Sequence, residues 1–218
     1  MNLTLVTPPQ LTDEPLSTEE VRDFLRLQQI DDEDTMSINR LIPAVREIAE
    51  VHSGRHQARK QFTLALDNFP SSRSIFTWPY STQYTDPILY QFQIGPSFIE
   101  LLDPLVSVDD FTFAKSDGTV VTLFENTDFV VDTLKHPGVV STPYGKTWPG
   151  DAGAPSSAVQ ITFTCGYLPA EVSASTKQWM VHRIAQMFTK RLPIDDVRAI
   201  IETPYMAELI NAKKLWKF

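Results

Sequence analysis

The sequence has one cysteine, only 8 glycines and no long apolar run. Cys165 has no second cysteine to pair with, which excludes a disulfide scaffold and indicates a reducing compartment of origin. We expect Cys165 to be a buried apolar side chain rather than a nucleophile. The amino terminus lacks the basic stretch and apolar core of a signal peptide, and no segment reaches the roughly 18 apolar residues of a membrane span. We therefore expect a soluble chain, synthesised in the cytoplasm, with no membrane partner.

Basic residues are scarce relative to acidic ones. The 218 residues include 19 lysines and arginines against 27 aspartates and glutamates, a net charge of −8, which excludes an extended basic nucleic-acid binder. The acidity lies mainly at the start: residues 1–34 hold nine acids and two bases, whereas residues 175–218 hold eight bases and four acids. Ends of opposite charge either lie against each other, within or between subunits, or face different partners; two ordinary solvated faces explain the counts equally well.

Both ends of the chain have helical spacing. Ser17-Thr18-Glu19-Glu20 has the form of a capping box and predicts a helix to about Leu27. An acidic cluster at residues 31–34 precedes a second helix that ends near Gly54, and Pro43 is expected to bend it or leave its first turns irregular. Two further helices are predicted, at residues 175–191 and after Pro204.

Between the helices the sequence alternates with the period of β-strands. Strands are predicted at residues 62–66, 98–102, 110–113, 120–124, 129–132 and 159–163. Short strands separated by turns are typical of an antiparallel sandwich or small barrel. The predicted fold class is α+β: a small helical bundle from residues 1–60 and 170–218, with an inserted β-sandwich or barrel-like module at residues 61–169.

Two motifs resemble ligand sites without completing them. Gly145-Lys146-Thr147 has the form of the end of a phosphate-binding loop, but Val140 stands where that motif requires its first glycine. His52 and His56 have the spacing of a helical metal pair, but Gly54 lies between them and favours a surface pair without metal. The sequence predicts no cofactor, no metal site and no catalysis.

Residues 71–97 are rich in aromatic side chains and prolines and poor in charge. Long aromatic loops bind sugars, nucleobases or other proteins, and a loop that folds back over an open sheet edge is the alternative. A carbohydrate-binding or carbohydrate-degrading module is accordingly the second functional hypothesis. It requires paired carboxylates beside the aromatics; the candidates are Glu100, Asp103, Asp109 and Asp110, which an acidic outer strand face explains equally well.

Several short segments, taken in order and spacing, resemble a known family. They are Leu3-Thr4-Leu5-Val6-Thr7-Pro8-Pro9, Glu14-Pro15-Leu16-Ser17, Gly54-Arg55, Leu64-Ala65-Leu66-Asp67-Asn68-Phe69-Pro70, Ile99-Glu100-Leu101, Pro104-Leu105, Tyr144-Gly145-Lys146-Thr147-Trp148-Pro149, residues 159–167 and Lys177-Gln178. Together they resemble the head-to-tail connector (adaptor) proteins of tailed bacteriophages. Residues 71–97 and the segment after Leu192 match that family less well.

The resemblance implies a structural virion protein of the neck, without catalysis or cofactors. Such proteins form a ring, usually a dodecamer, beneath the portal protein, extend the DNA channel and offer a platform for tail or stopper proteins. Genomic DNA would pass through without specific binding, and the particle would assemble in the cytoplasm of a bacterial host.

Three groups of residues are candidate contact sites in this reading. The basic and aromatic tail is predicted to dock onto the portal, unless it folds back onto the subunit's own helices: Lys213, Lys214, Leu215, Trp216, Lys217 and Phe218. Acidic residues near the amino terminus are predicted to face a neighbouring subunit or the channel: Glu19, Glu20, Asp23, Asp31, Asp32 and Asp34. The aromatic stretch is predicted to contact the tail side or a neighbour through Phe76, Trp78, Tyr80 and Tyr84.

Overall fold

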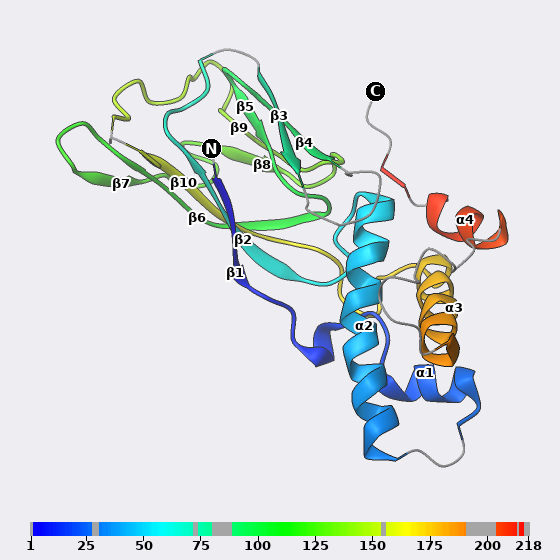
Figure 1. The fold of residues 1–218 in the computed structure, drawn as a ribbon. Helices are drawn as coiled ribbons and strands as arrows, with labels where there is room; N and C mark the ends of the chain where they lie inside the picture. Colours follow the sequence, from blue (N-terminus) through cyan, green and yellow to red (C-terminus); the bar gives the residue numbers. More distant parts are fainter. Residues whose placement is uncertain are drawn as a thin grey trace. The chain divides into compact units, whose positions relative to one another are not determined.

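The computed structural model describes residues 2–27, 31–71, 74–79, 89–153, 156–190, 204–212 and 214–215 (Figure 1). The chain divides into two compact units. The sheet unit comprises Met1–Pro8 and Arg59–Gly166, and the helical unit comprises Pro9–Ala58 and Tyr167–Phe218.

The helical unit is built from segments at both ends of the chain. A short 3-10 helix, η1 (Leu11–Asp13), precedes α1 (Thr18–Leu25) and α2 (Asp32–Ser53); α3 (Ala174–Lys190) and α4 (Pro204–Asn211) follow the sheet unit. The capping box is confirmed, since Ser17 Oγ accepts from the Glu20 N–H and Glu20 accepts from the Ser17 N–H in return. Gly54 ends α2 at a φ of 70°, in the left-handed region where glycine carries no steric penalty.

Of the two outcomes expected for Pro43, a bend in the helix or irregular first turns, the second does not occur. The residue lies inside α2, which continues from Asp32 to Ser53, so the first turns are helical rather than irregular. Ile38, Ile42 and Val45 are completely buried on either side of it. Burial of this apolar face outweighs the loss of one backbone hydrogen bond at proline.

The core of the helical unit forms where α2 and α3 pack against each other and against α4. Trp179 and Met180 of α3 are completely buried against the α2 stripe, and Met206 and Ile210 of α4 join them. The helices α2 and α3 run in opposite directions, because His52 near the end of α2 lies 5.7 Å from Trp179 near the start of α3, ring centre to ring centre.

The sheet unit contains two antiparallel five-stranded sheets. The first has the order β1-β2-β10-β6-β7, and its strands are β1 (Asn2–Thr7), β2 (Lys60–Leu66), β10 (Val159–Cys165), β6 (Leu105–Ala114) and β7 (Val120–Thr122). The second has the order β3-β4-β5-β9-β8, and its strands are β3 (Ser74–Pro79), β4 (Leu89–Gly95), β5 (Phe98–Glu100), β9 (Val139–Ser141) and β8 (Val130–Asp132).

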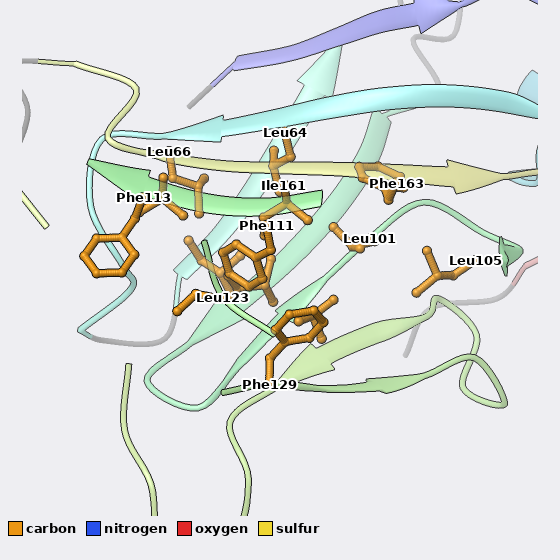
Figure 2. Close-up of a cluster of buried hydrophobic side chains, with 14 of the residues drawn as sticks. Leu64, Leu66, Leu101, Leu105, Phe111, Phe113, Leu123, Phe129, Ile161 and Phe163 are labelled. Atoms are coloured by element: carbon orange, nitrogen blue, oxygen red, sulfur yellow. The ribbon is translucent and has the colours of Figure 1, made fainter. Parts of the chain in front are cut away.

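Side chains from both sheets form a single apolar core (Figure 2). Leu64, Phe111 and Ile161 contribute from the first sheet, and Ile99 and Val140 from the second. The predicted α+β class with an inserted antiparallel sandwich is therefore confirmed, and Cys165 is buried in this core, as expected.

The structure contains strands that the sequence pattern does not predict. The amino-terminal strand β1 pairs with β2, so residues 2–7 belong to the sheet unit and not to the helical part in which the predicted boundary at residue 60 had placed them. The aromatic stretch is also not one loop, because β3 and β4 form an antiparallel pair within it. Within the described ranges, no helix is both long and apolar enough to cross a bilayer.

Candidate interaction surfaces

The predicted acidic residues lie on α1 and on the first turn of α2. Two of them also hold helix ends: Glu20 completes the cap of α1, and Asp31 Oδ1 accepts from the Asp34 N–H at a distance of 2.8 Å. Glu19, Asp23 and Asp32 are exposed, as are Glu20 and Asp31, whereas Asp34 is half-buried. The cluster therefore stabilises two helix amino termini and leaves negative charge at the surface of the helical unit.

A groove lies beside this acidic cluster, between the first half of α2 and the end of α3. Its volume is about 320 Å³, and it is lined by Glu33, Asp34, Ser37, Arg40, Leu41, Met187 and Phe188. The apolar lining residues are half-buried, whereas Glu33 and Arg40 are exposed. Sequence reasoning did not find this groove, because it depends on the pairing of two helices that are far apart in the chain.

A buried ion cluster anchors the segment before α1 to the middle of α2. Arg46 Nε lies 2.9 Å from a Glu14 carboxylate oxygen, and Arg46 Nη1 lies 3.1 Å from Glu50 Oε2; all three side chains are less than 5% exposed. Burial alone would lower the pKa of Arg46, but the charges of Glu50 and Glu14 hold that pKa above its ordinary value. Arg46 is therefore a permanent cation that is paired with two enclosed carboxylates.

The described part of the carboxy-terminal tail lies against the helical unit itself. The Leu215 N–H donates to the Ser53 carbonyl at 2.8 Å, and a Cβ placed on Gly54 would lie 3.4 Å from Leu215 Cβ. Lys214 is exposed. Lys213, Trp216, Lys217 and Phe218 lie outside the described residues, so docking of the tail onto a portal stays a prediction.

The aromatic candidates fall on or beside the β3–β4 pair. Phe76 is opposite Phe92 and Trp78 is opposite Tyr90 in the backbone register. Tyr80 and Tyr84 lie outside the described residues. Since β3 is at the end of its sheet, this stretch provides a sheet edge rather than a free loop.

The two motifs rejected as ligand sites have structural roles. Lys146 Nζ donates to the Thr127 carbonyl at 2.6 Å, and the described residues between β9 and β10 (142–153 and 156–158) form no helix to accompany a phosphate-binding loop. The expectation of a surface histidine pair is wrong for His56, whose exposed fraction is 4%. Its Nδ1 lies 3.6 Å from Glu50 Oε2, because the chain after Gly54 folds back beside α2. Among the described residues, no three His, Cys, Asp or Glu side chains are grouped so that they could bind a metal ion.

Three of the four carboxylates considered for a carbohydrate site, Glu100, Asp103 and Asp109, have separate hydrogen-bonding partners. Glu100 accepts from the Gln93 N–H at 2.8 Å, and the buried Asp103 lies 2.6 Å from His136 Nδ1. Asp110 is exposed on β6.

Asp109, on the outer face of β6, has a lowered pKa. Partial burial opposes its ionisation, but hydrogen bonds from Gln61, Thr164 and Ser107 outweigh burial and lower the pKa of its carboxyl. A general acid for glycoside hydrolysis needs a raised pKa, so Asp109 has the opposite property.

Comparison with known proteins gives structural matches only. No protein-family model and no curated protein matches the sequence. The fold is similar to a chain in the neck of an empty gene transfer agent (GTA) particle, computed with C6 symmetry, with a TM-score of 0.72 and 17% identity. It is also similar to chains in the virion of a native GTA particle (TM-score 0.68, 18% identity) and in the neck of a native GTA particle computed with C12 symmetry (TM-score 0.64, 17% identity). Each match covers 100% of this chain and 97% of the other, and at these identities the likeness shows a shared fold.

Proposed function

We propose that this protein is a structural component of the neck of a phage-like particle, where identical copies form a ring between the portal and the tail. The observation that carries the proposal is the full-length similarity to chains from GTA necks and a GTA virion. A match over a whole chain, both units included, is stronger support than a match to a sandwich or a helical bundle alone, since each of those architectures recurs in unrelated proteins.

The proposed ring has twelve copies, in keeping with the resemblance of the sequence to connector proteins. Two of the similar neck structures were computed with C6 and C12 symmetry, which supports rotational repetition of this fold. The proposed partners are other copies of the chain, the portal protein and a tail or stopper protein. The ring would surround the DNA path and let the DNA pass without specific binding, because the net charge of −8 disfavours contacts with phosphate.

Deletion of the gene from its phage or prophage tests this function. We expect DNA-filled heads that carry a portal but no tail, together with separate tails, and purified protein added to such heads should restore tail joining. Expression of the gene from a plasmid is the control for effects on neighbouring genes. Normal tailed particles after deletion, or a block in head assembly, would contradict the proposal.

A further inference from the structure

The groove between α2 and α3 combines a charged rim with an apolar floor. Leu41, Met187 and Phe188 provide the floor, and Glu33, at the end of the acidic amino-terminal cluster, stands at the rim. A volume of about 320 Å³ is enough for one large aromatic side chain. Methionine sulfur and phenylalanine both make favourable contacts with aromatic rings.

The chain itself contains a segment with the complementary chemistry. Residues 213–218 carry three lysines together with Trp216 and Phe218, and no acid. An aromatic side chain flanked by cations matches an apolar groove with an acidic rim in polarity and charge. Arg40, which also lines the groove, can stack on an indole ring.

The groove of the same subunit is out of reach of Trp216. Leu215 is hydrogen-bonded to Ser53 at the far end of α2. Leu41, the lining residue of α2 nearest to Ser53, is twelve residues away from it, or about 18 Å along the helix at 1.5 Å per residue. Trp216 follows Leu215 directly, so its Cα lies within about 4 Å of the Leu215 Cα.

We propose that the groove of each copy binds Trp216 from the tail of a neighbouring copy, with the tail lysines beside the acidic rim. This inference rests on the proposed ring, because a tail that leaves one subunit and a groove that belongs to the next form a head-to-tail contact, and a ring satisfies every such contact. It assigns the tail to a second copy of the chain in place of the portal.

Disulfide trapping tests the contact on the full chain. Ser37→Cys in the groove and Phe218→Cys at the end of the tail are introduced together, and the purified protein is oxidised. Native Cys165 is fully buried and does not interfere. We expect a ladder of covalent oligomers on a non-reducing gel, with each single-cysteine variant limited to dimers. The matched control pairs Phe218→Cys with Asp117→Cys, an exposed turn position in the sheet unit, and should give no ladder.

Charge exchange supplies a second measurement on the same trapped pair. Glu33→Lys should lower the ladder yield several-fold, and Lys217→Glu in the same chain should restore it. A single intrachain product, or no ladder, would overturn the inference. Electron micrographs of the same samples separate the two proposals. Rings in the absence of a ladder would contradict only the tail contact, and this is the result expected if the tail binds the portal. Absence of both rings and a ladder would contradict the proposed ring as well.

Discussion

Arg46 joins two parts of the helical unit that are distant in the chain. Its guanidinium contacts Glu14, in the connection before α1, and Glu50, one turn further along α2. Charges enclosed in this way gain from each other only while all of them are present, since a single unpaired buried charge is strongly destabilising. The cluster therefore fixes the path by which the chain enters the helical unit.

Removal of this cation should destabilise the protein strongly. Arg46→Leu leaves two buried carboxylates without their cation, and we expect the free energy of unfolding to fall by about 3–5 kcal/mol in urea titrations. Glu47→Gln is the control, because Glu47 lies 3.5 Å from the same guanidinium but its side chain is 52% exposed; its effect should stay within about 0.5 kcal/mol. Equal losses in the two variants would contradict this account of the cluster.

Asp109 makes the stability of the fold depend on pH, and the direction of this dependence follows from its lowered pKa. Because the pKa of Asp109 is lower in the folded protein than in the unfolded chain, its ionised form stabilises the fold above the ordinary aspartate value of about 3.9. That contribution is lost as the pH falls through the lowered pKa. We expect thermal melts to show wild type more stable than Asp109→Asn at neutral pH, with the difference shrinking in acid below about pH 4. The exposed neighbour variant Asp110→Asn controls for the loss of one charge, and a difference that grows in acid would contradict the argument.

At the scale of elements, Asp31 determines where α2 begins. Its side chain accepts a hydrogen bond from the Asp34 N–H, which has no partner within the helix. Asp31→Ala should reduce the free energy of unfolding by about 1 kcal/mol, measured by denaturant titration. Asp32→Ala, at the next residue, removes an equal charge but no cap, and should cost about 0.3–0.5 kcal/mol. If the free energy of unfolding falls equally in the two variants, the Asp31 cap contributes nothing beyond its charge.

The helices could be predicted from the sequence more completely than the strands. Caps at Ser17, Gly54 and Pro204 are local signals, and the structure has a helix end at each of them. The strands β1 and β9 have weaker local signals: in β1 the alternation of Leu3 and Leu5 with polar residues is short and most of the strand is exposed, and β9 is a three-residue strand that joins β5 to β8. Their pairing is determined by partners elsewhere in the chain, which local periodicity does not contain.

The candidate surfaces likewise divide into those with a signal in the local sequence and those that depend on how distant segments pack. The acidic cluster could be found by counting charges, because exposed charges stay exposed whichever way the helices pack. The groove and the buried cluster around Arg46 could not, because both depend on which helix faces meet. Glu14 illustrates this: a charge count does not distinguish it from the other acids of residues 1–34, whereas the structure encloses it.

At the scale of the whole molecule, we expect the opposite charges of the two ends to attract neighbouring copies to each other. Residues 1–34 carry a net charge of −7 and residues 175–218 a net charge of +4. In a closed ring each subunit presents one face to a different face of its neighbour, so opposite charges can lie across every interface.

Ring assembly should therefore depend on salt. We expect the ring fraction, measured by analytical ultracentrifugation in the presence of portal, to fall between low and high ionic strength, because salt screens exposed charges over about 10 Å at 0.1 M. Glu33→Lys should lower the ring fraction at low salt and reduce this salt dependence. A ring fraction that is the same at both ionic strengths would contradict the role assigned to charge.

The central claim is that this chain forms a ring at the neck of a particle. Single-particle imaging of the protein mixed with its portal tests the claim most directly, because class averages show both stoichiometry and location. The account predicts a ring of twelve copies stacked on the portal, coaxial with its channel. Unattached monomers beside intact portals, or copies distributed over the head surface, would contradict it.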